Sequence, residues 1–173
     1  VFDTSFHQKM PPQAYLYGLP YELYDEDRVR RYGFHGISHH YVALQAATYL
    51  KQRFQGLKIV TCHLDDEASL CAIDHGLSVD TSMGFTPLEG LLMGTRSGDL
   101  DPAIIPWLMA MEELTLHQVN TMMNKHSGLY GVSGVSSDMR EIIESAHENH
   151  SNARLALDAY CYRLKKYIAG YAA

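Results

Sequence analysis

The chain has 173 residues, of which 46% are hydrophobic and 20% are charged, and its formal net charge is −6 at pH 7. This composition is typical of one globular domain and disfavours intrinsic disorder and fibrous repeats. An acidic chain is a poor match for proteins that bind nucleic acid through bulk charge. No apolar run approaches the ~20 residues of a membrane-spanning helix. We therefore expect neither nucleic acid nor a membrane as a partner.

Proline, tyrosine and glycine crowd residues 1–33, which predicts a loop with short helical turns. A helix is expected over 38–54, with Ser38 as its N-cap. Three β-rich runs follow, and the tight turn His75-Gly76 joins the last two as a hairpin. The expected strands are residues 58–64, 68–74 and 77–81.

Four helices are expected in the rest of the chain, at residues 102–112, 115–125, 138–147 and 152–172. Thr115 and Gln118 form a capping-box pattern at the second of them. Ser136 or Ser137 is expected to cap the third. Strands followed by helices indicate an α+β or α/β unit. We divide the chain into a Pro- and Tyr-rich segment, 1–33, and the unit that follows it, 34–173.

The two ends of the chain and its cysteines indicate the kind of protein and the compartment that the chain comes from. It begins at Val1 without a methionine and ends at Ala173 within a helical pattern, so we expect a piece of a longer protein. The three cysteines are odd in number and form no CxxC pair, which predicts reduced thiols in the cytoplasm.

Four loops are dense in residue types that carry chemistry, at residues 2–7, 32–39, 84–99 and 133–140, and the last three combine glycines with Arg, His, Ser or Thr. Glycine lets the backbone approach a phosphate closely, and the polar side chains donate hydrogen bonds to it. These loops are therefore candidates for anion binding. Taken one at a time, each is equally well an ordinary glycine-rich turn.

The same loops carry four blocks that resemble the signature blocks of the acetate kinase family, in that family's order: VFDTSFHQKMP, YGFHGISH, DTSMGFTPLEGLLMGTRSGDLDPAI and SGVSSDMR. The resemblance covers essentially the whole chain. It implies an α/β fold of the sugar kinase, Hsp70 and actin type, here a partial ribonuclease-H-like domain with three adjacent strands followed by helices. It also implies Mg²⁺-dependent, reversible phosphoryl transfer from ATP to acetate, giving acetyl phosphate and ADP, in a homodimer. Propionate or butyrate remains an alternative acceptor.

The resemblance assigns roles to five residues. Asp3 matches the catalytic Asp that organises Mg²⁺, and His35 matches the active-site His that donates to phosphoryl oxygens. Arg96 matches the essential Arg that binds the carboxylate or the phosphoryl group. Phe34 and Pro87 match the apolar pocket for the acetate methyl group. The alternative for Asp3 is an exposed terminal carboxylate, for His35 an ordinary loop histidine, and for Arg96 a surface ion pair. For Phe34 and Pro87 it is packing in the core.

The resemblance also points to nucleotide contacts by Asp138 and Arg140, for which a helix-end charge and a solvated Arg are the alternatives. The nucleotide set includes His63, at the end of a strand. The family places a Gly-Asn-Gly loop directly after that strand, whereas this chain has Asp65, Asp66 and Glu67.

With three consecutive acids, this chain lacks the glycines of that loop and places negative charges beside the negatively charged polyphosphate. At an effective dielectric of about 20 and ~5 Å, each such pair costs roughly 3 kcal/mol. We predict impaired nucleotide binding at this loop. The interpretations are an inactivated or redesigned copy, a new metal site built from the acids, or a solvated acidic turn.

Three functions follow from these observations. The first is an acetate kinase fragment that is inactive alone. The second is a non-catalytic, self-associating module, because Lys58–Leu64 would be an open sheet edge without the parallel strand that the family places beside it. The third is a metal-dependent hydrolase that uses the acidic loop 65–67.

Overall fold

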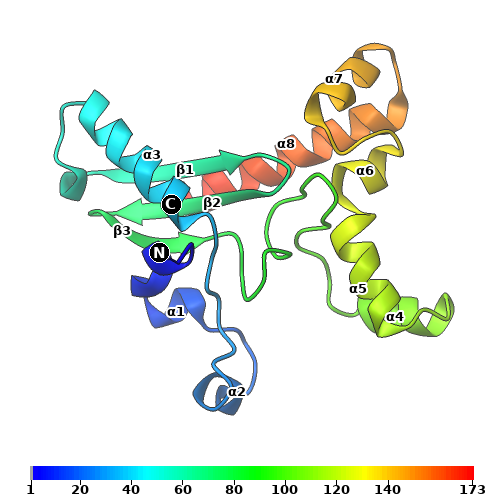
Figure 1. Cartoon of the computed structure of the whole chain (residues 1–173), viewed down its shortest axis with the longest axis horizontal. Coiled ribbons are helices and arrows are strands. Elements are labelled where there is room, and N and C mark those ends of the chain that lie inside the picture. The colour runs from blue at the N-terminus through cyan, green and yellow to red at the C-terminus, as the bar shows by residue number, and fades with distance from the viewer. Residues whose placement is uncertain (1) are drawn as a thin grey trace. The chain divides into compact units, whose positions relative to one another are not determined.

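The computed structural model describes residues 2–173, which form two compact units. The first unit comprises residues 2–64, 69–90 and 166–173, and the second comprises 65–68 and 91–165. Figure 1 labels the helices and strands. Those of the first unit are the 3₁₀ turns Ser5–Lys9 and Phe54–Gly56, α1 (Pro12–Tyr15), α2 (Tyr21–Asp25), α3 (Gly36–Tyr49), β1 (Lys58–Leu64), β2 (Ala68–Asp74) and β3 (Leu77–Thr81). Those of the second are α4 (Ile104–Met111), α5 (Leu116–Lys125), α6 (Gly128–Ser133), α7 (Met139–His147) and most of α8 (Ser151–Ala172).

The sheet of the first unit has the order β1-β2-β3, with β2 and β3 antiparallel. His75 and Gly76 have φ angles of 50° and 81°, and Asp74 pairs with Leu77 across them. Positive φ at both central positions is the geometry of a type I′ turn, so the predicted hairpin is confirmed. In the part of the chain that the structure describes, β1 is an edge strand.

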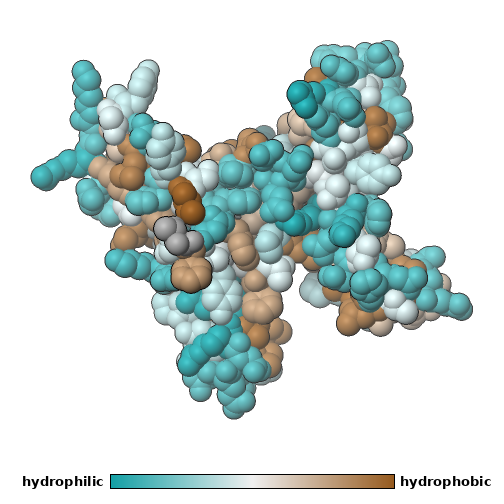
Figure 2. Space-filling model, in the orientation of Figure 1, coloured by the Kyte–Doolittle hydropathy of each residue, from teal (hydrophilic) through white to brown (hydrophobic). Residues whose placement is uncertain are grey.

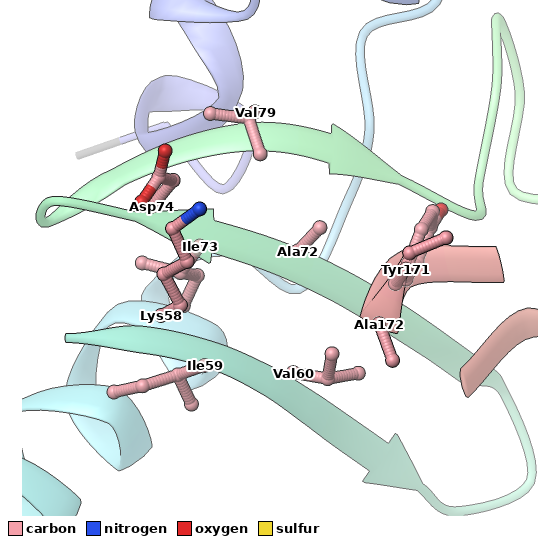
Figure 3. Close-up of a pocket in the computed structure, with 10 residues that line it drawn as sticks. Lys58, Ile59, Val60, Ala72, Ile73, Asp74, Val79, Tyr171 and Ala172 are labelled. Atoms are coloured by element: carbon pink, nitrogen blue, oxygen red, sulfur yellow. The ribbon is translucent and has the colours of Figure 1, made fainter. Parts of the chain in front are cut away.

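The two faces of this sheet are covered differently (Figure 1). Helix α3 packs on one face, where Ala43, Cys71 and Ile73 form a buried cluster with Phe6, Phe54 and Ile59. The last turn of α8 lies on the other face, where a pocket of about 420 Å³ opens between strands and helix. Figure 3 shows Tyr171 and Ala172 over Val60 and Ala72 in this pocket.

The core of the second unit consists of Leu129, Ile142, Ala156 and Tyr160. The predicted capping box is confirmed, because the side chains of Thr115 and Gln118 each accept from the other's backbone N–H. No helix among residues 2–173 is long and apolar enough to cross a membrane.

Two helix-cap predictions were wrong, and one helix was missed. Helix α7 is capped by Asp138, whose carboxylate accepts from the Arg140 N–H, and not by Ser136 or Ser137. Helix α3 begins at Gly36 with His35 in the N-cap position, while Ser38 is inside the helix. The Asp138 carboxylate caps its own helix locally, whereas contacts with Asp3 and Ser69 hold His35 in the N-cap position. Helix α6 was not predicted, since its glycines disfavour a helix in isolation.

Candidate functional site

Asp3 and His35 meet at the start of α3 in the first unit. The Asp3 carboxylate accepts from the backbone N–H of His35 at 2.5 Å, and the Asp3 carbonyl accepts from the Gly36 N–H at 3.0 Å. His35 has φ of 57°, in the left-handed region, and a Cβ at Gly36 would collide with the Asp3 carbonyl. The sequence pair His35-Gly36 therefore lets the chain turn sharply around Asp3.

A second contact set fixes the His35 ring. It stacks on the His63 ring with centroids 4.0 Å apart, and its Nδ1 lies 2.9 Å from the Ser69 hydroxyl. The His63 Nδ1 lies 2.9 Å from the Ser38 hydroxyl on α3. Residues from β1 and β2 thus contact the His35 imidazole, and Ser38 of α3 holds His63.

Behind His35 lies a buried histidine, His39. Its Nε2 is 2.8 Å from the same Ser69 hydroxyl, and its Nδ1 is 2.8 Å from the Thr61 hydroxyl. Burial, with smaller contributions from the histidines at 7, 35 and 63, lowers the His39 pKa to about 3. His39 is therefore neutral, and Ser69, which has one hydroxyl proton, couples its tautomer to that of His35.

His7 holds the backbone of the residue before His35. Its Nε2 donates to the Phe34 carbonyl at 3.0 Å, which leaves Nδ1 to accept from the Ser78 hydroxyl at 2.8 Å. Burial lowers the His7 pKa, consistent with this neutral tautomer. The sequence placed His7 and His39 within candidate loops without a role for either and did not single out Ser69, because their partners lie 22 or more residues away in sequence.

Phe34 and Pro87 are both half-buried. The loop that carries Pro87 is anchored by Glu89, which bonds the Arg31 guanidinium and the Tyr17 hydroxyl, each at 2.5 Å. Arg31 in turn donates to three backbone carbonyls of residues 81–83. This ionic anchor was not predicted, although Glu89 is the only acid within the apolar and glycine-rich run 82–94.

Arg96 belongs to the second unit, on a segment held by backbone bonds. Met93 and Gly94 accept from the N–H groups of Leu129 and Tyr130 at the start of α6, and Thr95 accepts from Ser127. These bonds satisfy the first turn of α6, which explains why a glycine-containing helix forms here. Gly128 has φ of 65°, and a Cβ there would meet the Met93 and Arg96 carbonyls. Arg96 therefore projects from a rigid base.

The Arg96 guanidinium has one paired and one unpaired end. Its Nη2 lies 2.7 Å from the Glu67 carboxylate. Its Nη1 is buried and has no hydrogen-bond partner among residues 2–173. A buried donor without a partner costs ~1–3 kcal/mol, more for a charged group. The unpaired nitrogen marks a position where an anionic ligand would be stabilised.

The acidic turn lies against this Arg96 segment. Gly94 N–H donates to the Asp66 carbonyl at 3.0 Å, and the Asp65 carboxylate accepts from the Asp66 N–H. The described residues contain no group of three or more His, Cys, Asp or Glu that could hold a metal ion. The acids at 65–67 therefore give no support to a metal centre of their own.

Asp138 and Arg140 bond to each other, through the cap of α7 and through an ion pair at 2.5 Å. Hydrogen bonds from Arg140 lower the Asp138 pKa to about 2. The structure thus gives both residues a structural role at a helix start. The candidate residues fall into two groups. Asp3, Phe34, His35 and His63 lie in the first unit, and Glu67 pairs with Arg96 in the second.

Comparisons with known proteins identify the type of fold. The crystal structure of Porphyromonas gingivalis acetate kinase matches 99% of the chain with a TM-score of 0.97 and 48% identity, over 43% of that protein. A propionate kinase from Francisella tularensis matches 99% with a TM-score of 0.96 and 44% identity, over 44% of its length. The chain therefore has the mixed α/β fold of these kinases, as the resemblance implied.

The sequence comparisons agree. Acetate kinases from Alkaliphilus metalliredigens and Caldicellulosiruptor saccharolyticus are 60% and 58% identical over all 173 residues. The Acetokinase family matches residues 1–173, and the chain belongs to that family. It spans 44% and 43% of the length of these two relatives.

Proposed function

We propose that this chain provides part of the active site of an acetate kinase-type phosphotransferase, which converts ATP and acetate reversibly to ADP and acetyl phosphate. The observation that carries the proposal is the Arg96 guanidinium, rigidly based and with a buried Nη1 that lacks an acceptor. A guanidinium fork binds carboxylate and phosphoryl oxygens equally well. Phosphoryl transfer depends mostly on positioning and charge stabilisation, which such a group supplies.

We assign two further roles to His35 and Asp3, which belong to the first unit. The His35 ring is held by Ser69 and His63, and we propose that it donates to a phosphoryl oxygen. Asp3 uses one carboxylate oxygen for the His35 N–H and retains lone pairs for a cation. Mg²⁺ usually takes one or two carboxylates plus substrate phosphates, so a single Asp fits it. When bound, Mg²⁺ neutralises charge on the reacting phosphates.

The remaining assignments rest on family membership. We propose that Phe34 and Pro87 contact the methyl group of acetate or a longer acyl chain. His63 and residues 65–67 would lie at the nucleotide phosphates, with Asp138 and Arg140 as further nucleotide contacts. We also propose that 1–33 is an interdomain segment and that 34–173 is an incomplete domain. The protein would act in the cytoplasm.

A chimera tests the function while supplying the parts outside this chain. The 173 residues replace the matching segment of the Alkaliphilus metalliredigens acetate kinase, and acetyl phosphate is trapped with hydroxylamine. We expect measurable turnover that falls ~100-fold or more in Arg96→Ala. Arg154→Ala, which removes an exposed Arg on α8, should leave it unchanged. Equal turnover in the Arg96→Ala and unmodified chimeras contradicts the proposal, and the isolated chain is expected to be inactive.

We also propose that the chain self-associates with a second copy. Helix α4 exposes Ile104, Trp107, Met109 and Met111, of which Trp107 is 55% exposed. Figure 2 shows brown surface on α4 among teal neighbours. Light scattering during size exclusion should give a mass that rises with concentration, and Trp107→Lys should abolish the rise. A mass that stays at 19.5 kDa at all concentrations contradicts this proposal.

A further inference from the structure

The Glu67 carboxylate forms an ion pair with the Arg96 guanidinium, the group that the proposed reaction needs. The Glu67 Oε1 to Arg96 Nη2 distance is 2.7 Å, and the two side chains are 45% and 23% exposed. Both groups are thus partly withdrawn from water, where a charge-assisted hydrogen bond is stronger than at an open surface. An anion that binds through both terminal nitrogens of Arg96 has to share Nη2 with Glu67 or displace it.

The backbone keeps Glu67 in this place. The Gly94 N–H donates to the Asp66 carbonyl, and an ideal Cβ at Gly94 would lie only 3.2 Å from that oxygen. The acidic turn is therefore seated against the same segment that carries Arg96. Because hydrogen bonds hold the backbone near both partners, the pairing has to order only the two side chains and not the loops that carry them.

We infer that Glu67 is a specificity-determining residue, an internal carboxylate that makes Arg96 select phosphoryl dianions over monocarboxylates. Free acetate offers Arg96 the same chemistry as Glu67, but it competes against a group whose effective concentration is in the millimolar range or above. A phosphoryl dianion brings more charge and a third oxygen, so it displaces Glu67 more readily. This inference rests on the proposed function only for the role of Arg96 as the anion-binding group.

The pairing is tested by chemical modification of the complete 173-residue chain. Phenylglyoxal reacts with accessible guanidinium groups, and peptide mass mapping gives a separate rate for each Arg. In Glu67→Gln we expect the Arg96 rate to rise about fivefold, the upper range for a partly exposed ion pair. Asp65→Asn removes the same charge from the same turn but no contact with Arg96, so its Arg96 rate should stay unchanged. Arg154, exposed on α8, serves as the internal reference for folding.

The selectivity is tested by protection of Arg96 with inorganic phosphate or acetate. In the unaltered chain we expect phosphate to slow the Arg96 reaction at concentrations where acetate has no effect, and in Glu67→Gln we expect both anions to protect. An unchanged Arg96 rate in Glu67→Gln, or equal protection by both anions in the unaltered chain, overturns the inference. Neither readout requires turnover, so failure of the phosphotransfer assay is a distinct result.

Discussion

The carboxylate of Asp3 accepts a hydrogen bond from the backbone N–H of His35, 32 residues later in the sequence, at a distance of 2.5 Å. The Asp3 carbonyl accepts from the next residue, Gly36. Two consecutive backbone donors at the start of α3 are therefore satisfied by one residue at the beginning of the chain. Since the first N–H groups of a helix need external partners, Asp3 stabilises the helix as well as the position of the His35 ring.

This arrangement predicts that Gly36→Ala destabilises the protein, although Ala normally favours a helix. The new Cβ would collide with the Asp3 backbone oxygen, which no side-chain rotation relieves. We expect the free energy of unfolding in urea to fall by ~1–3 kcal/mol. Gly170→Ala is the matched control, because nothing lies within 4 Å of its Cβ. It should gain up to about 1 kcal/mol, and equal effects at the two positions would contradict the packing.

The buried His39 predicts a loss of stability in acid. Burial lowers its pKa from 6.5 to about 3, so below pH 6.5 the unfolded chain binds a proton that the folded chain does not. Stability therefore falls as the pH drops from 6.5 towards 3, by at most about 1.4 kcal/mol per pH unit for this site. His7, whose pKa is lowered by burial, adds a slope of the same sign.

Urea unfolding measured between pH 7 and pH 4 checks this prediction. His39→Gln retains an amide that can bond the hydroxyls of Thr61 and Ser69 but removes the titrating group. Its unfolding free energy should depend less steeply on pH than that of the unaltered chain. His117→Gln, at an exposed position, should keep the original slope. A steep slope retained in His39→Gln would assign the acid sensitivity to other groups.

The sequence predicted those features whose causes lie within a few residues. The hairpin at His75-Gly76 and the capping box at Thr115 depend on local turn and cap chemistry, and both were correct. The candidate residues were found through motif resemblance, but their partners were not. Ser69 and His39 join His35 only when β2 and α3 pack together, and no spacing in the sequence encodes that contact.

The same reason accounts for the Glu67–Arg96 pair. The three acids were expected to repel a nucleotide, and that effect remains a prediction. Their actual neighbour, a guanidinium 29 residues along the chain, becomes visible only in the structure. Likewise, α6 forms because its free N–H groups find the Met93 and Gly94 carbonyls, which outweighs the low helix propensity of its glycines.

Asp138 offers a prediction that separates a structural from a nucleotide-binding role. Asn caps helices about as well as Asp, whereas Ala does not. We expect Asp138→Ala to reduce the unfolding free energy measurably and Asp138→Asn to change it little. In the chimera, nucleotide affinity that falls in both variants would indicate contact with the ligand, and affinity that falls only in Asp138→Ala would indicate the helix cap. Thermal unfolding and nucleotide titration of the same two variants provide the measurements.

Gly128 provides the test of the base that carries Arg96. Its φ of 65° strains any other residue, and a Cβ there would meet the Met93 and Arg96 backbone oxygens. Gly134 has a similar φ of 68° but nothing within 4 Å of its Cβ. Gly134→Ala should therefore show the strain alone, about 1 kcal/mol. Gly128→Ala should lose ~1–3 kcal/mol more and should also raise the phenylglyoxal reactivity of Arg96, because the segment that holds the guanidinium against Glu67 is displaced. Equal stability of the two variants, with unchanged Arg96 reactivity, would show that α6 does not support the Arg96 segment.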